Sequence, residues 1–178
     1  MTFEDHKKTD QDWPYRGSLF NVRVDTIHRM NNTSITREVV EHGDVVAIVP
    51  IDSEGNIFMV RQHRTPASRA LLEIPAGGIE SGEVPSVAAQ RELQEEVGMA
   101  ADELEQISGF YVSPGYCTEF VHLFLARSLS EKKLEADDDE DIEVVKMPLS
   151  EALKLACSGE IKDSKSITGI LLMAMENN

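Results

Sequence analysis

The chain has 178 residues, of which 41% are hydrophobic, and these values suit one globular domain with an appendage. Its formal net charge is −15 and its isoelectric point is near 4.6, which disfavours nucleic acid polymers and anionic membranes as partners and favours a small metabolite. Two cysteines are too few for a disulfide scaffold. Because no apolar stretch is long enough to span a bilayer and the polar N-terminus resembles no targeting peptide, we expect a cytoplasmic protein.

The N-terminal part of the chain predicts a small β-sheet. Residues 1–13 are polar and are expected to be frayed, with order beginning near Trp13. Nearly alternating apolar residues predict strands at residues 18–29 and 35–41, joined by a turn. Two or three such strands are only marginally stable alone, so this sheet is expected to bury its apolar face against another surface.

The remainder of the chain predicts a mixture of strands and helices. A continuous apolar run predicts a buried strand at residues 44–52, with a turn and an antiparallel partner strand at residues 56–62. The last helix is expected to pack through Ile167, Ile170, Leu171 and residues 173–175. Further strands are expected at residues 71–74, 104–112, 119–127 and 142–147, and helices at residues 84–97, 149–157 and 164–176.

Three glutamates lie together on the first predicted helix. Glu92, Glu95 and Glu96 are spaced i, i+3 and i+4, so their carboxylates project from one face within one turn. Like charges placed in this way repel one another by about 1–4 kcal/mol per pair at ~4 Å, so a cation is expected among them. A solvated acidic face with Arg91 as a surface partner is the alternative. An apolar strand and a glycine-rich loop precede the helix, and this order favours a site for hard divalent ions beside a phosphate.

The spacing of these residues matches a known pattern. Gly77, Glu83, Arg91-Glu92-Leu93, Glu95-Glu96 and Gly98-Met99 are similar, at every fixed position, to the signature box of the Nudix hydrolases. The resemblance covers nearly all of the chain after Trp13. It implies the Nudix fold, an α/β (mixed α+β) arrangement in which a mixed β-sheet lies between helices, with a tail and small antiparallel sheet at residues 1–42 and a catalytic domain at residues 43–178.

Other segments resemble the ADP-ribose pyrophosphatase subgroup of this family. Many relatives that cleave ADP-ribose carry an N-terminal antiparallel sheet swapped between the two subunits of a dimer. YRGSLFNVRVDTI with REVVEHGDVVAIVPID resembles this sheet, which implies a homodimer. Pro114 follows Met99 by about fifteen residues, which is typical of ADP-ribose hydrolases. The resemblance implies Mg²⁺-dependent hydrolysis of the pyrophosphate bond of ADP-ribose to AMP and ribose 5-phosphate. Two alternatives stay open: a sugar nucleotide or dinucleoside polyphosphate as substrate, and a module that binds ADP-ribose without cleaving it.

The resemblance also assigns roles to individual residues. Glu83 and Arg91 are expected to hold the loop against the helix rather than to contact a metal ion. Asp138, in the acidic segment EADDDEDIEVV, matches the catalytic-base position, although relatives commonly carry Glu there. Two or three Mg²⁺ ions, or Mn²⁺, are expected to be held by Glu92, Glu95, Glu96, Glu140 and the carbonyl of Ala76. The rivals of Asp138 as base are Glu95, Glu119, Asp137 and Asp139.

Substrate contacts are expected from four residues. Arg64 ends the basic segment VRQHR, and an arginine fork can engage two phosphate oxygens at once. Pro114 and Glu119 lie in SPGYCTE, which matches the subgroup closely. Tyr15, like Trp13, either anchors the small sheet or stacks on an adenine, and its position in the sequence does not decide between these interpretations.

Overall fold

The computed structural model describes residues 6–134 and 142–176, and its contacts divide the chain into two compact units. The first unit comprises Met1–Asp44 and Tyr111–Phe120, and the second comprises Val45–Phe110 and Val121–Asn178. The sequence did not indicate that Tyr111–Phe120 groups with the N-terminal sheet, and the division into domains at residue 42 stays a prediction. In the described parts of the chain, no helix is long and apolar enough to cross a bilayer.

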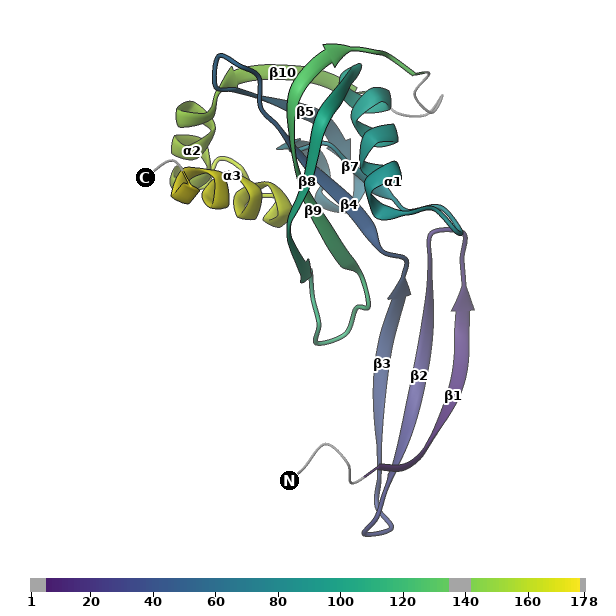
Figure 1. The fold of residues 1–178 in the computed structure, drawn as a ribbon. Coiled ribbons are helices and arrows are strands. Elements are labelled where there is room, and N and C mark those ends of the chain that lie inside the picture. The colour runs from purple at the N-terminus through teal and green to yellow at the C-terminus, as the bar shows by residue number, and fades with distance from the viewer. Residues whose placement is uncertain (1–5, 135–141, 177–178) are drawn as a thin grey trace. The chain divides into compact units, whose positions relative to one another are not determined.

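The first unit is an antiparallel sheet in the order β1-β2-β3 (Figure 1). Its strands are β1 (His6–Arg16), β2 (Phe20–Arg29) and β3 (Ser34–His42). The segment Tyr111–Phe120 is tied to β3, because the Val40 N–H donates to the Tyr116 carbonyl at 2.7 Å and the Thr118 N–H donates to the Val40 carbonyl at 3.0 Å. No residue described between Thr9 and Asp44 is buried, so this unit has no core of its own.

The expectation that residues 1–13 are frayed is wrong from His6 onward. β1 pairs with β2 along its length, with irregularities between His6 and Lys8 and between Asp12 and Tyr15. Contacts with β2 hold it there: Asp10 Oδ2 lies 2.8 Å from His28 Nε2, and the guanidinium of Arg23 lies 5.9 Å from the centre of the Trp13 ring. Because cross-strand polar contacts rather than apolar burial hold this strand, hydrophobic periodicity could not reveal it.

Among its described residues, the second unit contains two sheets and three α-helices, whose elements are labelled in Figure 1. β4 (Val45–Pro50) runs parallel to β9 (Phe120–Glu131) and antiparallel to β7 (Ala76–Gly78), so the larger sheet, in the order β7-β4-β9-β8, is mixed. The smaller sheet is antiparallel, in the order β10-β5-β6. The other elements are β5 (Asn56–Arg64), η1 (Thr65–Ala67), β6 (Arg69–Glu73), α1 (Pro85–Glu92), η2 (Leu93–Val97), β8 (Met99–Tyr111), β10 (Ile142–Pro148), α2 (Leu149–Ser158) and α3 (Ser164–Glu176).

Helices pack on both faces of β4. Val46 and Ile48 share a buried cluster with Ala88, Ala89 and Leu93 of the α1 segment. On the other face, α3 approaches so closely that a Cβ added to Gly169 would lie 2.7 Å from Val49 Cγ2. Successive residues of a strand point to opposite faces, so the apolar run of β4 serves both layers. The predicted fold, a mixed sheet between helices, is confirmed.

Two details of the sequence prediction are wrong. β4 and β5 are not partners in one ladder, because β7 and β9 occupy both edges of β4, and only an isolated bridge joins Ile51 to Ile57. On α3, Ile170 and Met173 are buried as expected, but Leu171 is 40% exposed and Met175 is 75% exposed. The helix turns these two side chains toward solvent, because only one of its faces packs against β4.

Candidate active site

The glutamates of the predicted site lie at the junction of α1 and a widened turn, η2. Pro85 occupies the first helical turn, where its missing N–H leaves no hydrogen bond unmade. Gly98 ends the segment with φ = 76°, and its N–H donates to the Leu93 carbonyl five residues back. The sequence predicted one regular helix over residues 84–97, whereas its last turn has π-helical hydrogen bonding, a feature that is frequent at functional sites.

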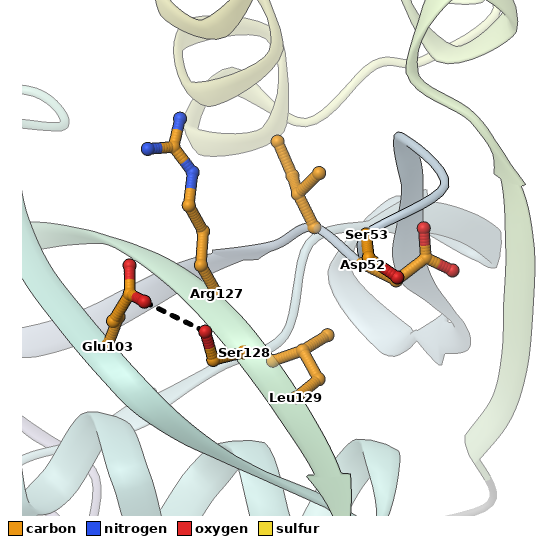
Figure 2. Close-up of a pocket in the computed structure, with 7 residues that line it drawn as sticks. Asp52, Ser53, Glu103, Arg127, Ser128 and Leu129 are labelled. Atoms are coloured by element: carbon orange, nitrogen blue, oxygen red, sulfur yellow. Dashed lines mark hydrogen bonds between the residues drawn. The ribbon is translucent and has the colours of Figure 1, made fainter.

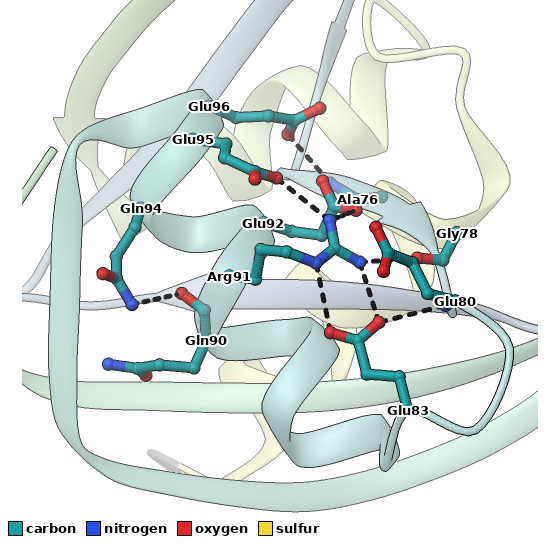
Figure 3. A network of polar contacts seen from close by, with 10 residues as sticks. All are labelled: Ala76, Gly78, Glu80, Glu83, Gln90, Arg91, Glu92, Gln94, Glu95 and Glu96. Atoms are coloured by element: carbon teal, nitrogen blue, oxygen red, sulfur yellow. Dashed lines mark hydrogen bonds and ion pairs between the residues drawn. The ribbon is translucent and has the colours of Figure 1, made fainter. Parts of the chain in front are cut away.

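Arg91 supplies the cation expected among the carboxylates (Figure 3). Its Nη1 lies 2.7 Å from Glu92 Oε1 and 3.0 Å from Glu95 Oε2. Its Nε and Nη2 contact the two carboxylate oxygens of Glu83 at 3.1 and 2.9 Å, and Nη2 also donates to the Gly78 carbonyl at 2.9 Å. The hydrogen bond to Glu83 raises the pKa of Arg91 although burial opposes it, and the same bond lowers the pKa of Glu83.

The glycine loop is shaped around Glu92. A Cβ added to Gly77 would overlap the Glu92 carboxyl group, so only glycine lets the backbone of β7 approach this side chain. The loop is closed by Glu80, whose N–H donates to Glu83 Oε2 at 3.0 Å. The glycines at 77 and 78, expected in a loop, form most of the short strand β7.

Glu96 contacts the first residue of β7. Its Oε2 accepts a hydrogen bond from the Ala76 N–H at 2.9 Å, while the predicted metal contact of the Ala76 carbonyl stays a prediction. Glu92 and Glu96 are 8% and 6% exposed, so both residues are buried, and Glu92 contacts the Arg91 guanidinium.

Carboxylate oxygens are ligands that Mg²⁺ prefers. The backbone at Gly77 packs directly against the Glu92 carboxyl group and restricts its position. Among the described residues, no three His, Cys, Asp or Glu side chains are arranged as ligands of one ion, and Arg91 lies between Glu92 and Glu95. The carboxylate oxygens are chemically suited to a hard divalent cation. In this structure the positive charge beside Glu92 and Glu95 comes from Arg91.

Comparison with protein families assigns this architecture. A model described as NUDIX domain matches residues 41–166. The chain belongs to the Nudix family. It is therefore a hydrolase, and its carboxylate helix lies within the matched residues.

The alignments with related proteins cover most of the chain. An ADP-ribose pyrophosphatase of Bacillus subtilis is 42% identical over 91% of this chain and 89% of its own length. A methanol dehydrogenase activator of Bacillus methanolicus is 36% identical over 95% and 91%, and a GDP-mannose pyrophosphatase of Salmonella arizonae is 35% identical over 84% of each chain. A solved structure described as an ADP compounds hydrolase has the same fold, with a TM-score of 0.84 and 24% identity over 97% of this chain and 95% of its own.

The predicted substrate arginine is not free at this Nudix site. Arg64 Nε and Nη2 contact the two carboxylate oxygens of Glu73 at 2.9 and 3.0 Å, and Lys165 also contacts this carboxylate. Sequence analysis missed both Glu73 and Lys165. The signal was available, because an acid inside the apolar segment Leu71-Leu72-Glu73-Ile74 needs a charged partner if it is buried.

The other predicted substrate residues belong to the first unit. Tyr15 is half exposed, and its ring centre lies 5.6 Å from that of Phe20. Pro114 is exposed, and Glu119 Oε2 lies 4.0 Å from His42 Nδ1. The structure thus places these residues in the unit that does not contain the carboxylate cluster.

Several predicted residues lie outside the described residues. These are the catalytic-base candidate Asp138, its rivals Asp137 and Asp139, and the metal-ligand candidate Glu140.

A cavity of about 340 Å³ lies elsewhere in the second unit (Figure 2). It is bounded by the turn after β4 and by Glu103, Arg127 and Ser128, whose Oγ donates to Glu103 Oε1 at 2.8 Å. None of the predicted site residues lines this cavity.

Proposed function

We propose that this Nudix hydrolase cleaves the pyrophosphate bond of ADP-ribose to AMP and ribose 5-phosphate, with Mg²⁺ or Mn²⁺ as cofactor. The observation that carries the proposal is the cluster of Glu92, Glu95 and Glu96, two of them buried, beside the strand end at Ala76. The ADP-ribose pyrophosphatase of Bacillus subtilis, at 42% identity, supports the choice of substrate.

The same residues would hold the metal. Glu92, Glu95, Glu96, the Ala76 carbonyl and Glu140 are the proposed ligands of two or three ions. Bound ions would neutralise phosphate charge and lower the pKa of a bound water. Arg91 contacts the Gly78 carbonyl in β7 and the carboxylates of Glu83, Glu92 and Glu95, so the ligands are positioned before substrate arrives.

Other residues of the chain bind the substrate and accept the proton of the attacking water. We propose that Arg64 donates to pyrophosphate oxygens and that Tyr15, Pro114 and Glu119 contact the rest of the nucleotide. Asp138 is the proposed base that takes the proton of the attacking water, with Glu95 and Glu119 as the alternatives within the described residues.

Two other functions are separable by experiment. The GDP-mannose pyrophosphatase relative supports a sugar nucleotide as the alternative substrate. A module that binds ADP-ribose without cleaving it is disfavoured, because three mutually repelling carboxylates would add nothing to binding an anion. It predicts unchanged ADP-ribose after long incubation.

A substrate panel tests the proposal. ADP-ribose, GDP-mannose and a dinucleoside polyphosphate are incubated with the protein, with and without Mg²⁺, in ¹⁸O-labelled water. We expect AMP from ADP-ribose only with the metal, and the labelled phosphorus identifies the atom that water attacks. Faster cleavage of GDP-mannose than of ADP-ribose would overturn the substrate assignment.

A variant connects this activity to the cluster. Glu96→Gln should lower turnover by several orders of magnitude while the fold survives, because a neutral amide cannot replace a charged metal ligand. Glu151→Gln, on the exposed face of α2, is the matched control and should keep wild-type turnover. Near-normal turnover in Glu96→Gln would remove the cluster from the chemistry.

We also propose a homodimer that forms through the N-terminal sheet, and a cytoplasmic location. The first unit buries none of its described residues, so its apolar side chains need another surface. Both cysteines, Cys117 and Cys157, are free thiols, which suits a reducing compartment.

A further inference from the structure

A partly buried ion network is centred on Glu73, three residues before Ala76, whose N–H contacts Glu96. Glu73, at the end of β6, is 2% exposed and contacts two cations, Arg64 of β5 and Lys165 of α3. Lys165 Nζ also lies 2.9 Å from Asp163 Oδ1. The network therefore joins two strands of the smaller sheet to the first turn of the C-terminal helix.

The helix that carries Lys165 is itself fixed in place. The Ser166 hydroxyl accepts a hydrogen bond from the Ile74 N–H at 2.8 Å and donates its own proton to Asp163. Three residues later, Gly169 brings the helix against Val49. Lys165 consequently has little freedom to leave Glu73.

Two cations offset the cost of burying Glu73. Burial alone would raise its pKa, but the hydrogen bonds from Arg64 and the charge of Lys165 outweigh it and hold the pKa below its ordinary value. The same pairing raises the pKa of Arg64, with smaller contributions from the charges of Glu96 and Asp163. Arg64 is therefore within electrostatic range of the proposed metal ligand Glu96.

The geometry leaves one side of Arg64 available. Glu73 engages Nε and Nη2, whereas Nη1 has no hydrogen-bond partner within residues 6–134 and 142–176. The Arg64 side chain remains 39% exposed although its partner carboxylate is buried. A guanidinium clamped along one edge presents its remaining donor in a fixed direction at low entropic cost.

We propose that Glu73 and Lys165 are positioning residues, which hold Arg64 ready to donate to a pyrophosphate oxygen of the substrate. This inference rests on the proposed function, because it needs Arg64 to contact the substrate. It differs from a purely structural role of the network, since an ion pair can be replaced without affecting affinity when it serves only the fold.

A double-mutant cycle tests the proposal. Arg64→Ala should raise KM by about 10- to 100-fold, the range expected for a lost charged hydrogen bond. Glu73→Gln keeps the shape but loses the charge, and it should raise KM by about tenfold with kcat within about twofold, because uniform binding is lost. The double variant should be no worse than Arg64→Ala alone, since the two residues act through one contact.

Matched variants separate positioning from stability. Arg61 and Glu143 form an exposed pair at 3.3 Å on the same sheet, and Arg61→Ala and Glu143→Gln should leave KM unchanged. If Glu73→Gln fails to fold, Lys165→Met loosens the clamp from the α3 side and should raise KM by about threefold or more. In the ligand-free protein, the Arg64 Nε–H should exchange slowly with solvent, and either variant should accelerate the exchange.

Clear outcomes would overturn the inference. They are wild-type KM in folded Glu73→Gln or Lys165→Met, wild-type KM in Arg64→Ala, and multiplicative effects in the double variant. Failure of the proposed function looks different, because wild-type protein would then leave ADP-ribose intact. In that case the same cycle is measured with the nucleotide that the panel identifies.

Discussion

The Arg91 side chain supplies the positive charge at the centre of the carboxylate cluster. It contacts three carboxylates and one carbonyl, and it comes from the residue directly before Glu92. Sequence spacing predicted both the cluster and the need for a cation, and the sequence offered two candidates, divalent metal ions and Arg91. Because the side chain folds back across the loop, its role depends on a β7 conformation that spacing does not encode.

Removing this charge should destabilise the protein. Arg91→Ala leaves Glu83, Glu92 and Glu95 without their shared partner, and we expect a loss of about 2–4 kcal/mol in the free energy of unfolding, since breaking a largely buried pair costs several kcal/mol. Thermal unfolding with and without Mg²⁺ measures the effect. Added Mg²⁺ should restore more stability to the variant than to wild type. Arg69→Ala, at an exposed position, should change stability by less than about 0.5 kcal/mol.

Glu73 predicts a pH dependence of stability. Its folded-state pKa lies below the ordinary value of 4.5, so its charge stabilises the fold above that pH and the contribution is lost as pH falls below it. Glu73→Gln should therefore be less stable than wild type near pH 7, and the difference should shrink as the pH falls below about 4.5. Urea unfolding across this range measures it. A difference that stays constant would show that the Glu73 charge does not contribute.

Strands and helices with a strong apolar pattern could be predicted from the sequence, whereas the pairing of the strands within sheets could not. Asp52 accepts the N–H groups of Glu54 and Asn56, so the reversal between β4 and β5 is encoded locally. Nothing in that turn specifies which sheet each strand enters. That choice follows from the distant segments β7, β9 and β10, which local sequence patterns cannot place.

Because α3 lies close to β4 at Gly169, adding one methyl group there should destabilise the protein. Gly169→Ala would place its Cβ 2.7 Å from Val49 Cγ2 and 3.4 Å from Ile74 Cδ1, so the helix must shift. We expect a loss of about 1–3 kcal/mol, although alanine favours helices by about 1 kcal/mol over glycine. Chemical denaturation measures it, with Gly43→Ala as the neutral control because no atom lies within 4 Å of its added Cβ. Equal stability of Gly169→Ala and wild type would contradict the tight packing.

For the whole molecule, the net charge of −15 explains why the few cations at the site matter. Arg64, Arg91 and Lys165 all contact glutamates, so the site holds its positive charge in fixed pairs rather than as a basic surface. Such an arrangement suits a small phosphate compound and gives little long-range attraction for a polymer. Composition predicted this preference before any element was placed.

The first unit has exposed apolar side chains and no buried residue among those described, which predicts that it forms an interface with a second copy of the chain. Leu19 is 71% exposed and Tyr116 is 58% exposed, which a free unit of three strands would not tolerate well. We expect a homodimer by light scattering after size exclusion, and the double variant Leu19→Glu with Tyr116→Glu should weaken it by at least about tenfold. Met175→Glu, equally exposed on α3, should leave the dimer intact. A wild-type chain that is monomeric at micromolar concentration would contradict the dimer.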